Sequence, residues 1–171
     1  MSPLIDPDKL LSLSHAKEVI IVDARAGTDA KARYLNNHLA GALFVDLDTE
    51  LADIKDDLSN GGRHPLPSPG QFSYLLTKLG ITPASHVIVY DDKNASNAAA
   101  RFWWMLKSIN HKKVQVLNGG FEAAISAGFP ASSKAELPLI KEPYGHVTRT
   151  LPLTNINEVE RATHDDNYIL I

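Results

Sequence analysis

Four short runs of apolar residues recur along this 171-residue chain, and each is followed by a stretch with helical character. The runs cover Val19–Val22, Ala42–Val45, Val87–Tyr90 and residues 114–117. The first run is continuous and β-branched without polar alternation, which is typical of a strand buried on both faces of a parallel sheet. Strand–helix alternation repeated about four times predicts an α/β fold, a doubly wound parallel sheet with helices on both faces.

Capping signals mark the helices between these strands. Ser68 followed by Pro69 and Gln71 predicts a helix start, because serine caps the helix, proline suits its first position and glutamine completes a capping box. Gly80 predicts the end of this helix. Asp6 and Pro7 predict an earlier helix with an apolar face. Further helices are expected near residues 29–37, at 98–107, and in the stretch FEAAISAG that Gly128 closes.

Composition excludes several classes of site. The chain has no cysteine, which excludes disulfides, thiolate metal ligands and thiol nucleophiles within it. The seven histidines show no metal-ligand spacing along a helix, so we expect neither a metal nor another cofactor. The formal net charge is −3 without a basic stripe, which argues against a nucleic-acid partner. With no apolar run of membrane-span length and no secretory signal, we expect no membrane partner and a cytoplasmic location.

The loop after the third apolar run is the strongest candidate site. Its residues are Asp91, Asp92, Lys93, Asn94, Ala95, Ser96 and Asn97. A strand, a short loop and a helix N-terminus together form a common place to hold an anion or a nucleophile. Here the loop opens with two carboxylates, so the shape of such a site is predicted without its usual chemistry.

The chain end repeats the chain start. Residues 6–22 align without a gap on residues 155–171 at an offset of 149, so that Leu10 meets Val159 and His15 meets His164. Chance similarity between two generic helix–strand units is one explanation. The other is that a second copy of the domain begins near Thr154. We therefore expect a domain over residues 1–130, an extended surface linker over 131–153, and the truncated start of a second domain over 154–171.

Six stretches of the chain carry a specific family resemblance. They are IVDAR (21–25), YLNNHLAGALFVDLD (34–48), HPLPSPGQF (64–72), HVIVYDD (86–92), ARFWWML (100–106) and VQVLNGGF (114–121). In this order they resemble the N-terminal half of a two-domain rhodanese, the thiosulfate and 3-mercaptopyruvate sulfurtransferase family. The resemblance implies a rhodanese-like α/β domain and fits a tandem of two such domains.

The resemblance also implies roles for single residues. Active domains of this family carry a cysteine in the loop after the fourth strand, within a nest of backbone N–H groups that stabilises a persulfide. Asp91 stands at that position, which implies a non-catalytic domain whose missing C-terminal partner supplies the cysteine. A carboxylate there cannot accept sulfur, and Asp92 beside it would repel thiosulfate. Asp48 and His64 match the pair that mercaptopyruvate-type members lend to the interdomain site, although a turn residue and a loop residue are the plainer interpretation.

Alternative functions remain open at this point. The parent protein is expected to move sulfane sulfur from a small donor, thiosulfate or 3-mercaptopyruvate, to a thiophilic acceptor, with this chain inactive alone. The alternative is a rhodanese-like binding or regulatory module. Asp23 and Arg25 are expected to form a structural ion pair near the loop rather than to bind substrate. The surface left where a second domain should lie favours a homodimer of the isolated chain.

Overall fold

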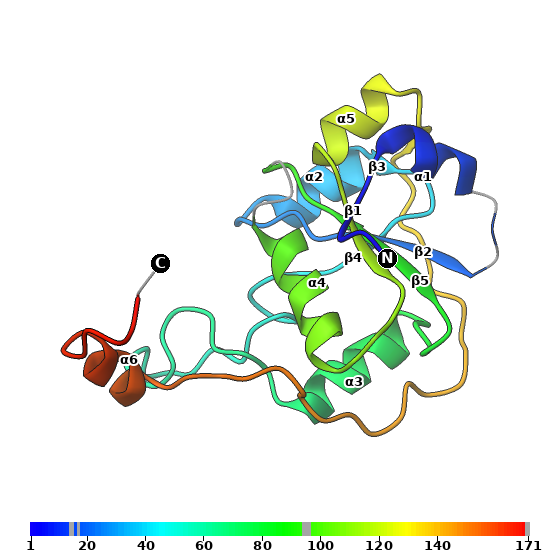
Figure 1. Cartoon of the computed structure of the whole chain (residues 1–171). Helices are drawn as coiled ribbons and strands as arrows, with labels where there is room; N and C mark the ends of the chain where they lie inside the picture. Colours follow the sequence, from blue (N-terminus) through cyan, green and yellow to red (C-terminus); the bar gives the residue numbers. More distant parts are fainter. Residues whose placement is uncertain (14–15, 17, 94–96, 170–171) are drawn as a thin grey trace.

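The computed structural model describes residues 1–13, 16, 18–93 and 97–169, and Figure 1 shows their arrangement. The elements in chain order are β1 (Leu4–Ile5), α1 (Pro7–Leu13), β2 (Val19–Asp23), α2 (Ala30–Asn36), β3 (His38–Leu39), β4 (Leu43–Phe44), α3 (Pro69–Lys78), β5 (His86–Tyr90), α4 (Ala98–Ser108), β6 (Val114–Leu117), α5 (Gly120–Ser126), β7 (Ala131–Ser132) and α6 (Ile156–Ala162).

A five-stranded parallel sheet lies at the centre, in the order β1-β6-β5-β2-β4. β5 is the middle strand, and it pairs along its whole length with β2, from His86 opposite Val19 to Tyr90 opposite Asp23. The predicted doubly wound parallel sheet is therefore confirmed. The strands β1, β3 and β7 were not predicted, because two residues are too few to show a periodic pattern.

Helices cover both faces of the sheet, and alternate residues of β5 face each layer. Val87 and Val89 belong to one core cluster with apolar residues of α3 and α4. Ile88 and Tyr90 belong to the other, with residues of α1 and α5. In Figure 1, α3 and α4 lie on one side of the sheet, and α1 and α5 lie on the other. Burial on both faces explains why the strands lack polar alternation.

The predicted signals for α3 are confirmed. The Ser68 hydroxyl accepts the backbone N–H of Gln71 at 3.2 Å, and the Gln71 side chain accepts the backbone N–H of Ser68 at 2.7 Å. Pro69 is the first helical residue. Gly80 follows the helix with a φ of +65°, a left-handed conformation that favours glycine. A single local pattern in the sequence thus determines both ends of this helix.

The segment after α5 is held against the domain more firmly than a surface linker would be. Tyr144 and Val147 are buried in the core cluster beside α3 and α4. The backbone N–H of Tyr144 donates to the Thr77 hydroxyl at 3.0 Å, and the N–H of Thr150 donates to the Ser108 carbonyl at 2.6 Å. No pattern in the sequence predicts these anchors. The division of the chain at residues 130 and 153 stays a prediction.

The tail after this segment has a different environment. Asn155 and Glu158 form a capping box at the start of α6, but no residue of this fully described helix is buried. Figure 1 shows α6 projecting away from the sheet. Leu10, the predicted counterpart of Val159, is fully buried under the sheet. His15 and Ile171 lie outside the described residues, and the proposed repeat stays a prediction.

Among the helices in the described ranges, we find none with the length and apolar character needed to cross a lipid bilayer. A close backbone approach occurs at Gly80, at the end of α3. A Cβ atom at Gly80 would lie 2.2 Å from the carbonyl oxygen of Leu139, in the segment that follows α5. That distance is well inside van der Waals contact, so this glycine lets the segment approach the end of α3.

We predict that Gly80→Ala costs about 2–4 kcal/mol of folding free energy, because left-handed strain and a backbone clash act together. Gly128→Ala is the matched control, since Gly128 also follows a helix with positive φ but would place its Cβ in open space. It should cost only about 1–2 kcal/mol, the strain alone. Urea unfolding measures both values, and equal losses would show that the contact with Leu139 is unimportant.

A pH effect on stability is expected from His111. Its Nε2–H donates to the Ser85 carbonyl at 3.0 Å, and its Nδ1 accepts the Tyr144 hydroxyl at 2.8 Å, an arrangement that requires a neutral ring. Burial lowers the pKa of His111 below its ordinary value. The unfolded chain therefore binds a proton first as pH falls below about 6.5, and the free energy of unfolding decreases there.

In unfolding experiments at about pH 7.5 and about pH 5.5, His111→Gln should show a smaller loss of stability on acidification than the wild type. His164→Gln, which removes an exposed histidine of the tail, serves as the control and should retain the wild-type loss. An identical loss in all three proteins would mean that His111 titrates alike in the folded and unfolded states.

Candidate functional site

The candidate site lies at the carboxyl ends of the central strands. Asp23 ends β2, Asp91 follows β5, and the turn Asn118–Gly120 follows β6. Because the strands are parallel and adjacent, their loops meet at one edge of the sheet, which is where open α/β sheets bind ligands. The fold therefore brings together side chains that are far apart in the sequence.

The side chain of Asp91 is buried inside its own loop, with 1% of the residue exposed. Its Oδ1 accepts the backbone N–H of Lys93 at 2.9 Å, and its Oδ2 accepts those of Asn97 and Ala99, each at 3.2 Å. These N–H groups belong to the loop and to the first turn of α4. The cradle that could hold an external anion thus holds the chain's own carboxylate.

Asp91 also caps α4 from a distance. No capping hydrogen bond from the Asn97 side chain is found in the described part of this helix start, and the Asp91 carboxylate takes that role for Ala99. A negative charge at this position interacts favourably with the helix dipole. The sequence analysis predicted the cradle but not its internal occupant. The loop residues Asn94, Ala95 and Ser96 lie outside the described residues.

A glycine turn supports the same loop from β6. The backbone carbonyl of Asp91 accepts the N–H of Phe121 at 3.1 Å. A Cβ atom at Gly120 would lie 2.3 Å from that carbonyl oxygen, so only glycine permits the approach. The turn Asn118–Gly120 therefore secures the loop after β5.

Asp92 is neutralised by a neighbouring element. Its carboxylate forms an ion pair with Arg33 of α2. Arg33 also pairs with Asp29 at 3.2 Å and donates to the Ala26 carbonyl at 2.8 Å, so its position is well defined. The repulsion that two adjacent acids would exert on an anion is reduced, because Asp92 has a cation beside it and Asp91 has N–H donors.

Asp23 and Arg25 form a buried ion pair, with 0% and 4% of each residue exposed. The Arg25 Nη2 donates to Asp23 Oδ2 at 2.7 Å and to the Asn37 carbonyl at 2.7 Å. The Tyr90 hydroxyl donates to the same carboxylate oxygen at 2.7 Å. Burial, and then the negative charge of Asp23, raise the pKa of Tyr90, which therefore remains a neutral donor. This network links the ends of β2 and β5.

Asp48 and His64 lie together at the base of the long loop 45–68. His64 Nε2 and Asp48 Oδ1 are 2.7 Å apart, although sixteen residues separate them in the chain. The His64 side chain is 24% exposed and that of Asp48 is 53% exposed, so solvent and ligands can reach the pair. The Asp48 backbone is itself held by its N–H bond to Asp46 Oδ1 at 2.9 Å. An imidazole oriented by a carboxylate is suited to proton transfer near neutral pH.

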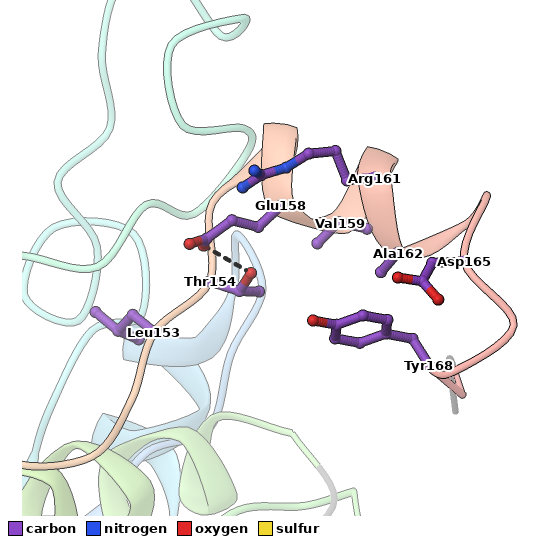
Figure 2. A pocket seen from close by; sticks show the side chains of 8 residues that line it. All are labelled: Leu153, Thr154, Glu158, Val159, Arg161, Ala162, Asp165 and Tyr168. Atoms are coloured by element: carbon purple, nitrogen blue, oxygen red, sulfur yellow. Dashed lines mark hydrogen bonds between the residues drawn. The ribbon is translucent and has the colours of Figure 1, made fainter.

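The described residues contain no metal-binding cluster, and a large cavity among them is confined to the tail. Among them, no group of three or more acidic or histidine side chains is placed to hold a metal ion. A cavity of about 630 Å³ is formed within the tail, and Figure 2 shows its lining. The lining residues are Leu153, Thr154, Glu158, Val159, Arg161, Ala162, Asp165 and Tyr168. Glu158 is already bonded to the Thr154 hydroxyl at 2.9 Å, and no other element of the fold contributes to this cavity.

Comparisons with known proteins agree with this geometry. The family model of the rhodanese-like domain matches residues 6–127. The chain is 37% identical over 109 residues to the 3-mercaptopyruvate sulfurtransferase of Escherichia coli K12, covering 60% of this chain and 37% of the relative. It is 37% identical over 111 residues to the thiosulfate sulfurtransferase of Bos taurus, covering 64% and 36%.

A solved structure gives the same result. SseA from Escherichia coli, a protein described by its rhodanese fold, superposes with a TM-score of 0.79 at 28% sequence identity, covering 97% of this chain and 63% of that one. The expected rhodanese-like fold is therefore confirmed. The chain spans about a third of the length of the two curated relatives, 37% and 36%.

We predict that Asp91→Ala destabilises the domain by about 2–4 kcal/mol, because backbone donors of the loop and of α4 lose a charged acceptor. Asp91→Asn should lose less, since its amide retains one acceptor oxygen. Asp57→Ala is the matched control, because Asp57 accepts the Ser59 N–H at 2.9 Å in an exposed turn. It should leave stability unchanged in urea unfolding, and a similar result for Asp91→Ala would contradict the role given to this carboxylate.

Proposed function

This chain belongs to the rhodanese-like domain family, and we propose that it is the non-catalytic domain of a sulfurtransferase. In this proposal a second rhodanese-like domain of the same protein carries the catalytic cysteine. The full protein would move sulfane sulfur from thiosulfate or 3-mercaptopyruvate to a thiophilic acceptor. The family relatives support sulfur transfer as the reaction class, because those compared above are named for these two donors.

The state of Asp91 is the observation that carries the proposal. The family resemblance implies that sulfur transfer requires a cysteine at this position, and the whole chain has no cysteine. The Asp91 carboxylate is buried and accepts the backbone N–H groups of Lys93, Asn97 and Ala99. It therefore occupies the space and the donors that an anionic sulfur species would need. A persulfide has to form on a residue outside this chain.

The reaction sets a clear demand on the rest of the protein. The thiolate of the second domain attacks the transferable sulfur of the donor, so an S–S bond forms and the donor's S–S bond (thiosulfate) or C–S bond (3-mercaptopyruvate) breaks. Thiosulfate releases sulfite with the bonding electrons and needs no proton. 3-Mercaptopyruvate releases the enolate of pyruvate, whose carbon takes up a proton. A thiol or cyanide then accepts the sulfur and regenerates the thiolate.

We propose that the pair Asp48–His64 supplies the proton that the enolate of pyruvate takes up when 3-mercaptopyruvate is the donor. The two side chains are 2.7 Å apart and accessible, and they lie on a loop rather than in the core. The carboxylate orients the imidazole, which can then deliver its proton to an enolate placed next to it. This role requires the second domain to present its cysteine loop to this face. The domain would thus form one wall of the interdomain cleft.

The test uses the protein of the natural gene, with this chain and its cysteine-bearing domain. We predict that His64→Asn and Asp48→Asn each lower kcat/KM for 3-mercaptopyruvate at least about 10-fold, because general acid catalysis contributes about 10²–10⁴-fold. Activity with thiosulfate should change much less. His146→Asn removes an exposed histidine elsewhere and should have no effect. Unchanged activity in both variants would contradict the assigned role, and a gene product that lacks any cysteine would favour a binding module instead.

A further inference from the structure

A single arginine side chain bridges two parts of loop 45–68 that lie far apart in the sequence. Arg101 lies in the first turn of α4, directly after the loop of Asp91. Its Nε and Nη2 donate to the Leu51 carbonyl at 3.0 and 2.8 Å. The same Nη2 donates to the carbonyls of His64 and Pro65 at 2.9 and 3.2 Å. One guanidinium therefore spans the base of loop 45–68.

The contacts of the base are local and specific. The backbone N–H of Asp53 donates to the Pro65 carbonyl at 3.0 Å. This bond directly connects the same two parts of the loop that Arg101 bridges. Leu51 is fully buried in the core cluster of α3 and α4, so one side of the base is fixed. Arg101 attaches the other side, at His64 and Pro65, to that fixed point. Asp48, three residues before Leu51, is thereby held beside the His64 imidazole.

A second arginine binds the same short stretch from another segment of the chain. Arg149, in the extended segment after α5, donates to the carbonyl of Pro67. Among the described residues, no carboxylate forms an ion pair with Arg101 or Arg149, so backbone carbonyl dipoles are their only polar acceptors. Burial lowers the pKa of Arg101, and the positive charge of Arg149 lowers it further.

We propose that Arg101 is a positioning residue for His64, which holds the backbone of residues 64 and 65 so that the imidazole meets Asp48. Arg149 reinforces this position through Pro67. The importance of this arrangement for sulfur transfer rests on the function proposed above, whereas the positioning itself does not. The arginine is a specific requirement, because its planar fork reaches several carbonyl groups at once, and a lysine ammonium cannot reproduce that geometry.

The arrangement also connects the two halves of the site. The carboxylate of Asp91 caps the first turn of α4, and Arg101 belongs to that same turn. The start of α4 is thus fixed by one acid before it and in turn fixes the loop of His64. Because α4 packs in the core, it holds the loop of Asp91 and the loop of His64 in a fixed relative position.

The test measures the chemical accessibility of His64 in the 171-residue chain. Diethyl pyrocarbonate acylates free imidazole nitrogens, and peptide mass spectrometry gives the rate for each histidine. His164, exposed in the tail, is the internal reference, and the buried His38 and His111 report unfolding. We expect Arg101→Met and Arg101→Lys to raise the rate at His64 relative to His164 by about two- to fivefold, the range that an exposed ion pair contributes.

Arg63→Met is the matched control, because Arg63 is adjacent to His64 and forms no ion pair or hydrogen bond with the described residues around it. It removes the same charge and should leave the rate at His64 unchanged. Asp48→Asn should raise the rate by itself and add nothing in the Arg101→Met background. That lack of additivity separates positioning from a general loss of stability.

An unchanged His64 rate in folded Arg101→Lys overturns the proposal, whatever Arg101→Met does. If Arg101→Met unfolds, His38 and His111 become reactive, and the lysine variant decides. The outcome is independent of the proposed function. A raised His64 rate together with full activity of His64→Asn would keep the positioning and reject the proton-transfer role. An unchanged His64 rate together with an inactive His64→Asn would reject the positioning role of Arg101 and keep the proton-transfer role of His64.

Discussion

The carboxylate of Asp91 is the interaction on which the architecture of the site depends. It lies where the central strand β5 ends, and its acceptors satisfy backbone N–H groups of the following loop and of α4. Without it, the start of α4 would leave donors unpaired in a buried place. A nest of N–H groups needs a negative charge, and this domain supplies its own. The same contact that completes the fold fills the cradle with the chain's own carboxylate.

The long loop between β4 and α3 depends on a second set of polar contacts. Loop 45–68 contains neither helix nor strand over its fully described length, so side chains have to determine its path. Arg101 and the Asp48–His64 pair close its base, and the exposed part of the loop lies beyond them. Because α4 carries Arg101 and begins at the Asp91 cradle, the two candidate regions share one rigid element. The exposed pair is then the part of this domain that a partner domain could use.

Local patterns in the sequence predicted the fold well where burial determines structure. The run Val87–Tyr90 is apolar at each position because both faces of β5 are covered, and Ser68 with Gln71 forms a complete cap. The two-residue strands β1, β3 and β7 escaped prediction because sheet pairing, rather than their own residues, determines them. Tyr144 and Val147 escaped because two apolar residues in a proline-rich stretch show no period, although they are buried.

The site was less predictable for a physical reason. The positions of Asp91, Asp48 and His64 came from a family resemblance, and only the three-dimensional structure brings the last two to 2.7 Å. The burial of Asp91 was not predicted, because adjacent acids in a loop usually face solvent. Arg101 resembles an ordinary charged residue on an amphipathic helix. Its acceptors are carbonyl groups of residues about forty to fifty positions away, which no local pattern shows.

The central claim is that this domain does not carry the sulfur itself. The most direct measurement is intact and peptide mass spectrometry of the natural gene product after incubation with thiosulfate and with 3-mercaptopyruvate. We expect one sulfur atom to be added to a cysteine outside residues 1–171, with these residues unmodified. A persulfide-free gene product that has no cysteine, or sulfur found within this chain, would contradict the account.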